Sequence, residues 1–104
     1  MASSMGYLNY ILEQLSDLDW ITHRSMMGEY ILYFRGKIAA YLCDDRLLVK
    51  PVQAARDMMP NARYERPYDG AKEMLLVDNV DDRAFLTNLM EAMYGELPSP
   101  RKKK

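Results

Sequence analysis

The chain has 104 residues, of which 49% are hydrophobic and 28% are charged. This length and composition predict one globular domain with its own core and exclude a largely disordered protein. No apolar run approaches the roughly 18 residues that a membrane-spanning helix needs. The single cysteine, Cys43, excludes an intrachain disulfide, and without a recognisable export signal it predicts a cytoplasmic protein.

The formal net charge of −1 conceals an uneven distribution. Four positive charges stand at the C-terminus, so the rest of the chain carries −5. Phosphate backbones repel an acidic body, and nucleic acid is therefore not expected to bind the folded part. Any contact with an anion is expected from the terminal basic run, Arg101, Lys102, Lys103 and Lys104.

The first element expected is a helix over residues 7–18. Apolar residues recur there at helical spacing, and polar residues fall between them. The stripe consists of Leu8, Ile11, Leu12, Leu15 and Leu18.

From residue 20 to residue 50 the apolar period changes from the helical value to two, which predicts strands over 21–26, 29–34, 38–43 and 47–49. Arg35-Gly36 and Asp44-Asp45 are short breaks typical of tight hairpin turns. Connections this short join antiparallel neighbours, so the region is expected to form a meander.

The second half predicts a short helix over 52–59, bounded by Pro51 and Pro60. Two weaker strands, 62–66 and 73–77, follow around the turn at 68–70. A last helix is expected over 81–94, with Gly95 as its stop. The fold class is thus α+β: an antiparallel sheet of a meander plus a hairpin, packed with N- and C-terminal helices in the order α-β(3–4)-α-β(2)-α. Residues 1–95 are expected to be the domain and 96–104 a disordered basic tail.

The run Met26-Met27-Gly28-Glu29-Tyr30-Ile31-Leu32-Tyr33-Phe34-Arg35-Gly36-Lys37, with Ile38–Lys50 after it, resembles the N-terminal domain of the TfoX/Sxy family. That family is named for regulators of bacterial competence and shows a similar turn-and-strand, Gly-Lys hairpin and Asp-Asp strand. The resemblance extends over most of residues 7–94. It implies the α+β fold and a regulatory role, and it implies no catalytic residue, metal or cofactor.

The residues themselves also predict no catalytic or metal site. Adjacent strand residues point to opposite faces, so Asp44 and Asp45 are better explained by a turn than by acid–base chemistry. His23 and Cys43 are the only histidine and cysteine, and we expect both to have structural roles. No zinc-ligand spacing and no glycine-rich phosphate loop is present.

The function that we expect is therefore a non-catalytic regulatory or protein-interaction domain, binding a protein partner or a second copy. Large apolar side chains alternate onto both faces of the expected meander, and a second apolar face usually meets another helix or another chain. The candidate partner surface consists of Met27, Tyr30, Tyr33 and Tyr41. Two alternatives remain open: a nucleic-acid-associated accessory protein that uses the basic tail, and an enzyme with an unrecognised pocket.

Overall fold

The computed structural model describes residues 5–26, 28–67 and 69–97 of the chain. The helices and strands of this part follow one another as α1 (Met5–Gln14), β1 (Ile21–Met26), β2 (Glu29–Phe34), β3 (Lys37–Cys43), β4 (Arg46–Val49), α2 (Gln53–Met58), β5 (Tyr64–Glu65), β6 (Met74–Leu76) and α3 (Arg83–Tyr94). None of the helices in these ranges has the length and apolar character needed to cross a bilayer.

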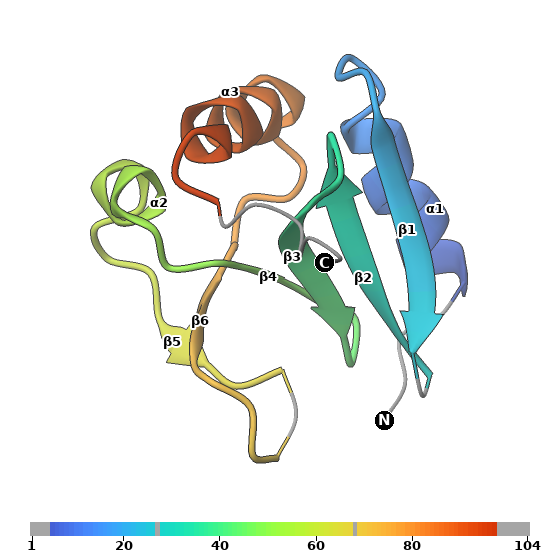
Figure 1. Cartoon of the computed structure of the whole chain (residues 1–104), viewed down its shortest axis with the longest axis horizontal. Helices are drawn as coiled ribbons and strands as arrows, with labels where there is room; N and C mark the ends of the chain where they lie inside the picture. Colours follow the sequence, from blue (N-terminus) through green and yellow to red (C-terminus); the bar gives the residue numbers. More distant parts are fainter. Residues whose placement is uncertain (1–4, 27, 68, 98–104) are drawn as a thin grey trace, which may run out of the picture.

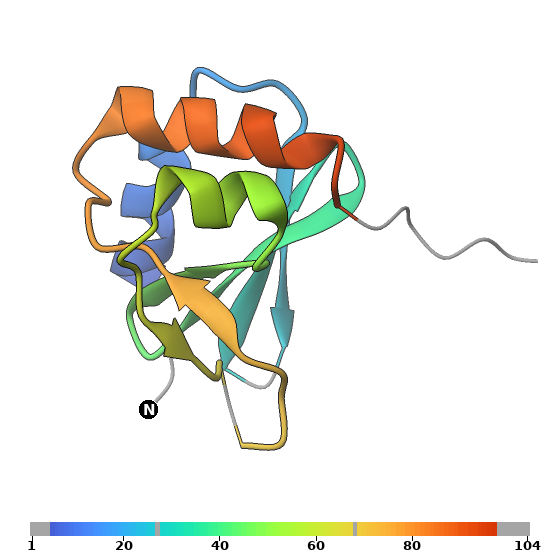
Figure 2. The ribbon, with the colours of Figure 1, turned by 90° about the vertical axis from the view of Figure 1, so that its left-hand side faces the viewer.

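The strands form one six-stranded sheet in the order β1-β2-β3-β4-β6-β5, and every neighbouring pair is antiparallel. The hairpin of β5 and β6 joins the meander through β6, which lies beside β4 (Figure 1). The helix α1 lies behind β1, and α3 packs against both α1 and α2, so that the three helices lie on one face of the sheet (Figures 1 and 2). The predicted α+β class and antiparallel sheet are confirmed.

One continuous core lies between the helices and the face of the sheet that we call the inner face. All three helices contribute to it, with Leu8 and Ile11 from α1, Ala55 from α2 and Leu86 among others from α3. The strands add side chains at alternate positions, as the period of two requires. These inner-face side chains are Leu32, Phe34, Ala40, Leu42, Leu47, Val49 and Leu75.

Both predicted hairpin turns of the meander form, and their backbone explains the residues found there. Gly36 has φ +84° and follows Arg35 at +53°, while Asp44 and Asp45 have +57° and +55°. Paired positive φ values match the right-handed twist of adjacent strands in a two-residue hairpin. Glycine adopts them without strain, and aspartate tolerates them better than most residues.

The first helix is shorter than predicted. It ends at Gln14, although Leu15 and Leu18 are buried as the apolar stripe implies. A turn with hydrogen bonds from Leu15 N to Leu12 O and from Leu18 N to Leu15 O carries these two side chains to the core. A helical apolar pattern can therefore continue through a tighter turn, because both geometries return the chain to the same side.

The last helix ends at Tyr94 as predicted, but it begins at Arg83, two residues later than expected, and Gly95 does not end it in the expected way. The Asp82 carboxylate caps it by accepting a 3.0 Å hydrogen bond from Phe85 N. Gly95 keeps right-handed helical angles, with φ −66°, instead of reversing the chain. Packing continues through Glu96 to Leu97, which is 4% exposed, two residues beyond the boundary expected at residue 95.

Candidate interaction surface

The opposite face of the sheet, called here the outer face, carries a row of side chains that crosses five strands. The register aligns Arg24, Ile31, Tyr41, Leu48 and Leu76 from β1 to β6. Leu48 is fully buried, Ile31 is 8% exposed, and Tyr41 and Leu76 are half-buried. The row therefore has an apolar floor with larger side chains partly open to solvent.

A second small core supports this row from the outer face. It consists of Cys43, Leu48 and Met74, with Tyr41 and Leu76 packed against it. Every one of these residues comes from a strand, whereas the side chains of all three helices belong to the inner core. The outer face is therefore apolar, as the alternation predicted, and strand side chains bury part of it.

A cavity of about 260 Å³ adjoins Tyr41 on this face. Its wall comes from the start of the α2 connection and from the loop before β6. The lining residues are Tyr41, Lys50, Pro51, Pro67, Ala71, Lys72, Glu73 and Met74. The lining combines apolar residues with two lysines and one glutamate, which is an arrangement suited to a partner side chain with polar neighbours.

Arg46 closes one end of the outer face. Its Nε donates a 3.2 Å hydrogen bond to the Cys43 carbonyl, and its guanidinium forms an ion pair with Glu65. These contacts tie β4 to β5 across β6, since β5 pairs only with β6 in the described sheet. The ion pair thus holds the hairpin that forms one wall of the cavity.

Cys43 lies beneath this surface as a protonated, buried thiol. Burial, together with the neighbouring Glu29 carboxylate, raises its pKa to about 12. The Glu29 Oε1 atom is itself buried and has no hydrogen-bond partner among the described residues. A thiol with such a pKa is a poor nucleophile near neutral pH.

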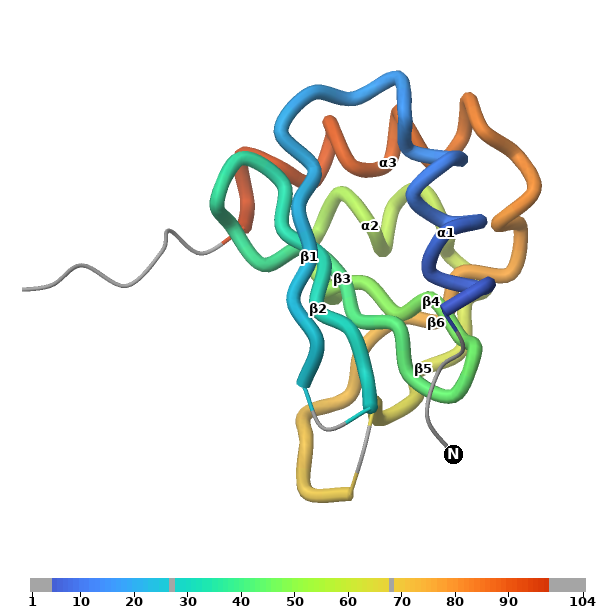
Figure 3. Tube along the Cα trace, turned by 90° about the vertical axis from the view of Figure 1, so that its right-hand side faces the viewer, coloured from blue at the N-terminus to red at the C-terminus, as the bar shows by residue number. Residues whose placement is uncertain are grey.

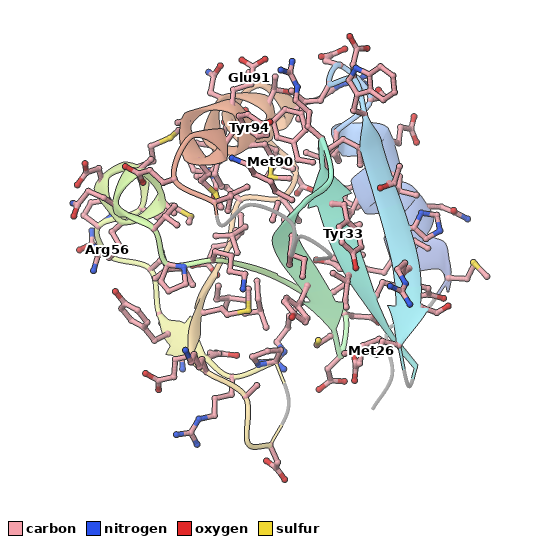
Figure 4. The ribbon with its side chains drawn as sticks, viewed as in Figure 1. Met26, Tyr33, Arg56, Met90, Glu91 and Tyr94 are labelled. Atoms are coloured by element: carbon pink, nitrogen blue, oxygen red, sulfur yellow. The ribbon has the colours of Figure 1, made fainter. Side chains whose placement is uncertain are left out.

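The four residues of the candidate partner surface do not share one face. Tyr33 and Tyr41 point to the outer face, and Figure 4 shows Tyr33 in front of β2. Tyr30 is half-buried against the inner core. Met27 lies outside the described residues, as do the four basic residues at 101–104.

His23 and Cys43 are also separated. The register places His23 opposite Leu32, on the inner-face side of β1, whereas Cys43 faces outward from β3. His23 is exposed, and its ring lies edge-on to Tyr30 with centroids 6.2 Å apart. No group of three or more His, Cys, Asp or Glu side chains is placed to hold a metal ion within residues 5–26, 28–67 and 69–97.

The sequence reasoning missed Leu48 and Leu76 as members of the outer row. The alternation of apolar residues signalled that each strand has a second apolar face. Only the register, however, shows that Leu48 lies opposite Tyr41 and that Leu76 of β6 lies opposite Leu48.

These features define a small α+β domain whose helices cover one sheet face and whose other face presents tyrosines beside an apolar cavity. Residues 13–91 match the family described as the TfoX N-terminal domain. Because the match spans more than half of the chain, the protein belongs to this family of competence-regulator-like domains, and the resemblance seen in the sequence is confirmed. The chain is also 32% identical over 105 residues to the "Uncharacterized 12.7 kDa protein in trpE 5'region" of Spirochaeta aurantia. That alignment covers 100% of this chain and 91% of the relative. No solved structure matches the chain significantly.

Proposed function

We propose that this protein is a non-catalytic regulatory domain that binds a protein partner through the outer face of its sheet. The observation that carries the proposal is the combination of Tyr41 with the adjoining cavity on a face to which no helix of the described chain contributes. Tyrosine supplies a large rigid contact area with a polar end, and it is enriched at protein interfaces.

The dimensions of the surface support a side chain as the anchor. A cavity of about 260 Å³ is smaller than the range of about 300–1,000 Å³ typical of small-molecule sites. An apolar side chain of the partner would fill its base against Met74 and Pro67. The lysines at 50 and 72 would lie beside the backbone or an acidic neighbour of that side chain.

Catalysis is not supported by the placement of the reactive groups. His23 and Cys43 lie on opposite faces of the sheet, and the high pKa of the thiol keeps it protonated. General acid–base or nucleophilic chemistry needs such groups within hydrogen-bond reach of each other.

The proposal is tested by site-specific photo-crosslinking in cells, with a photoreactive amino acid replacing Tyr41. The matched control replaces Glu91, an exposed residue of α3 (Figure 4). We expect one discrete crosslinked product from position 41 that is absent from position 91. Changing Leu76 to Asp should reduce that product, because the charge would stand next to Leu48, which separates Leu76 from Tyr41 in the apolar row. Identical products from both positions, or no product from position 41, would contradict the proposal.

A further inference from the structure

The strand β1 is an open edge of the sheet. It pairs with β2 on one side, and no strand of the described chain lies on its other side (Figure 3). Its register with β2 runs from Ile21↔Phe34 to Met26↔Glu29 without a shift, and residues 22–25 are exposed. Native edges this long and regular usually carry lysine, proline or a bulge to prevent pairing, but β1 has only Arg24 as a charged residue.

The alternation of hydrogen bonds along β1 shows which backbone groups are unpaired at the open edge. Arg35 N donates to Trp20 O at 3.0 Å, so Trp20 faces the second strand. Antiparallel pairing alternates residue by residue, and the backbone groups of Thr22, Arg24 and Met26 therefore also point to β2. The N–H and C=O groups of residues 21, 23 and 25 point away from the sheet.

We propose that β1 pairs with β1 of a second copy in antiparallel orientation, about a two-fold axis at His23. This register places Ile21 opposite the partner's Ser25 and keeps five of the six residues of each strand in line. The outward backbone groups then bond to each other, and the two sheets become one.

Electrostatic repulsion disfavours the alternative pairing of the two strands. The other arrangement that aligns five residues is centred on Arg24, and it would set two arginines directly opposite each other. Like charges at opposing positions destabilise a strand pair. In the His23-centred register Arg24 instead faces the partner's Thr22, so no arginine meets an arginine.

The exposed Trp20 indicates why the occupant is a second copy instead of an unrelated peptide. Its side chain is 73% exposed at the start of β1, although tryptophan is usually well buried. Trp20 immediately precedes β1 and has φ +67°, and the His23-centred register brings it to the end of the paired strands, next to the partner's Met26. Indole and thioether groups attract each other, and the two-fold axis forms this contact twice.

Sedimentation equilibrium of variants with opposite charges at His23 tests the register. We expect the full chain to dimerise, and we expect His23→Lys and His23→Glu each to weaken self-association about fivefold, because like charges then meet at the axis. An equimolar mixture of the two variants should regain dimers at least as tight as those of the wild type. Asn88→Lys, which changes the charge on the exposed side of α3, should leave association unchanged.

Amide exchange of the unaltered protein gives a second readout that needs no variant. The amides of Ile21, His23 and Ser25 should gain protection as the protein concentration rises, while those of Thr22 and Arg24 should stay constant. A monomer at concentrations up to about 1 mM, or a mixture of the two variants that stays monomeric, overturns the proposal. His23 lies away from the cavity beside Tyr41, so these results do not depend on the outer-face proposal.

Discussion

The Lys37 ammonium lies 4.2 Å from the centroid of the Tyr94 ring and donates a 3.2 Å hydrogen bond to the Tyr94 carbonyl oxygen. A single side chain from β3 thus contacts both the ring and the backbone at the C-terminal end of α3. The Arg35 Cζ atom lies 5.4 Å from the centroid of the Tyr94 ring, and the Phe34 ring contacts Tyr94 edge-on. The hairpin of β2 and β3 therefore holds the end of α3 through cations at the negative pole of the helix.

Lys37→Met should lower the free energy of unfolding by about 1 kcal/mol, because it removes the cation–π contact and the charge at the helix end. Urea denaturation followed by circular dichroism measures the change. Lys72→Met removes an exposed lysine without such a contact and should stay within about 0.5 kcal/mol of the wild type. Equal midpoints for the two variants would show that the Tyr94 contact contributes nothing.

Glu96 supplies the N-terminal cap that α2 lacks locally. Val52 offers no side-chain cap, and the Glu96 carboxylate instead accepts a 2.8 Å hydrogen bond from Ala54 N. Glu96→Ala should cost about 1 kcal/mol, and Leu97→Ala, which empties a buried site, should cost about 2–4 kcal/mol. Thermal or urea unfolding measures both. Glu91→Ala, on the exposed side of α3, serves as the control, and a Glu96→Ala variant that matches it would disprove the capping role.

Asp45→Val should destabilise the protein by about 1–2 kcal/mol, since a β-branched residue is strained at φ +55°. Asp45→Asn preserves the shape and tolerates the same backbone, and it should unfold at nearly the same urea concentration as the wild type. Should the valine variant be as stable as the asparagine variant, the strained turn would not contribute to stability as described.

The Cys43 thiol should resist alkylation in the folded protein at pH 8. Its pKa of about 12, against an ordinary value of 9.0, leaves about a thousandfold less thiolate, and the side chain is also fully buried. Labelling with iodoacetamide in buffer and in urea measures the difference. Complete labelling of the native protein at the rate of the unfolded chain would contradict the placement of this residue.

The same pKa predicts how stability depends on alkaline pH. A group whose pKa is higher in the folded state contributes its full stabilisation below its unfolded pKa and loses it as the pH rises through the folded value. The free energy of unfolding should therefore fall between about pH 9 and pH 12. Burial also raises the pKa of Tyr7, and the hydrogen bond to Asp81 raises the pKa of Tyr10, so Cys43→Ala should retain a shallower slope from these tyrosines. Parallel slopes for the two proteins would exclude a contribution from Cys43.

Features that depend on neighbours a few positions apart could be predicted from the residue pattern. The alternation along residues 29–34 and 38–43 requires strands with two apolar faces, and the positive-φ turns require residues such as Gly36 and Asp44. The same patterns allowed the family to be recognised before the fold was known. These predictions succeeded because the hydrogen bonds and sterics involved are local.

Which distant groups meet depends on how the whole chain packs. The cap of α2 comes from Glu96, 42 residues away from Ala54, and the outer row exists because β6 inserts between β4 and β5. The open edge of β1 likewise depends on its place in the sheet, since no other strand lies beside it in the described chain. A residue pattern specifies how a segment folds and which side is apolar, but the partner of that side depends on the packing of the whole chain, in which many weak contacts are satisfied together.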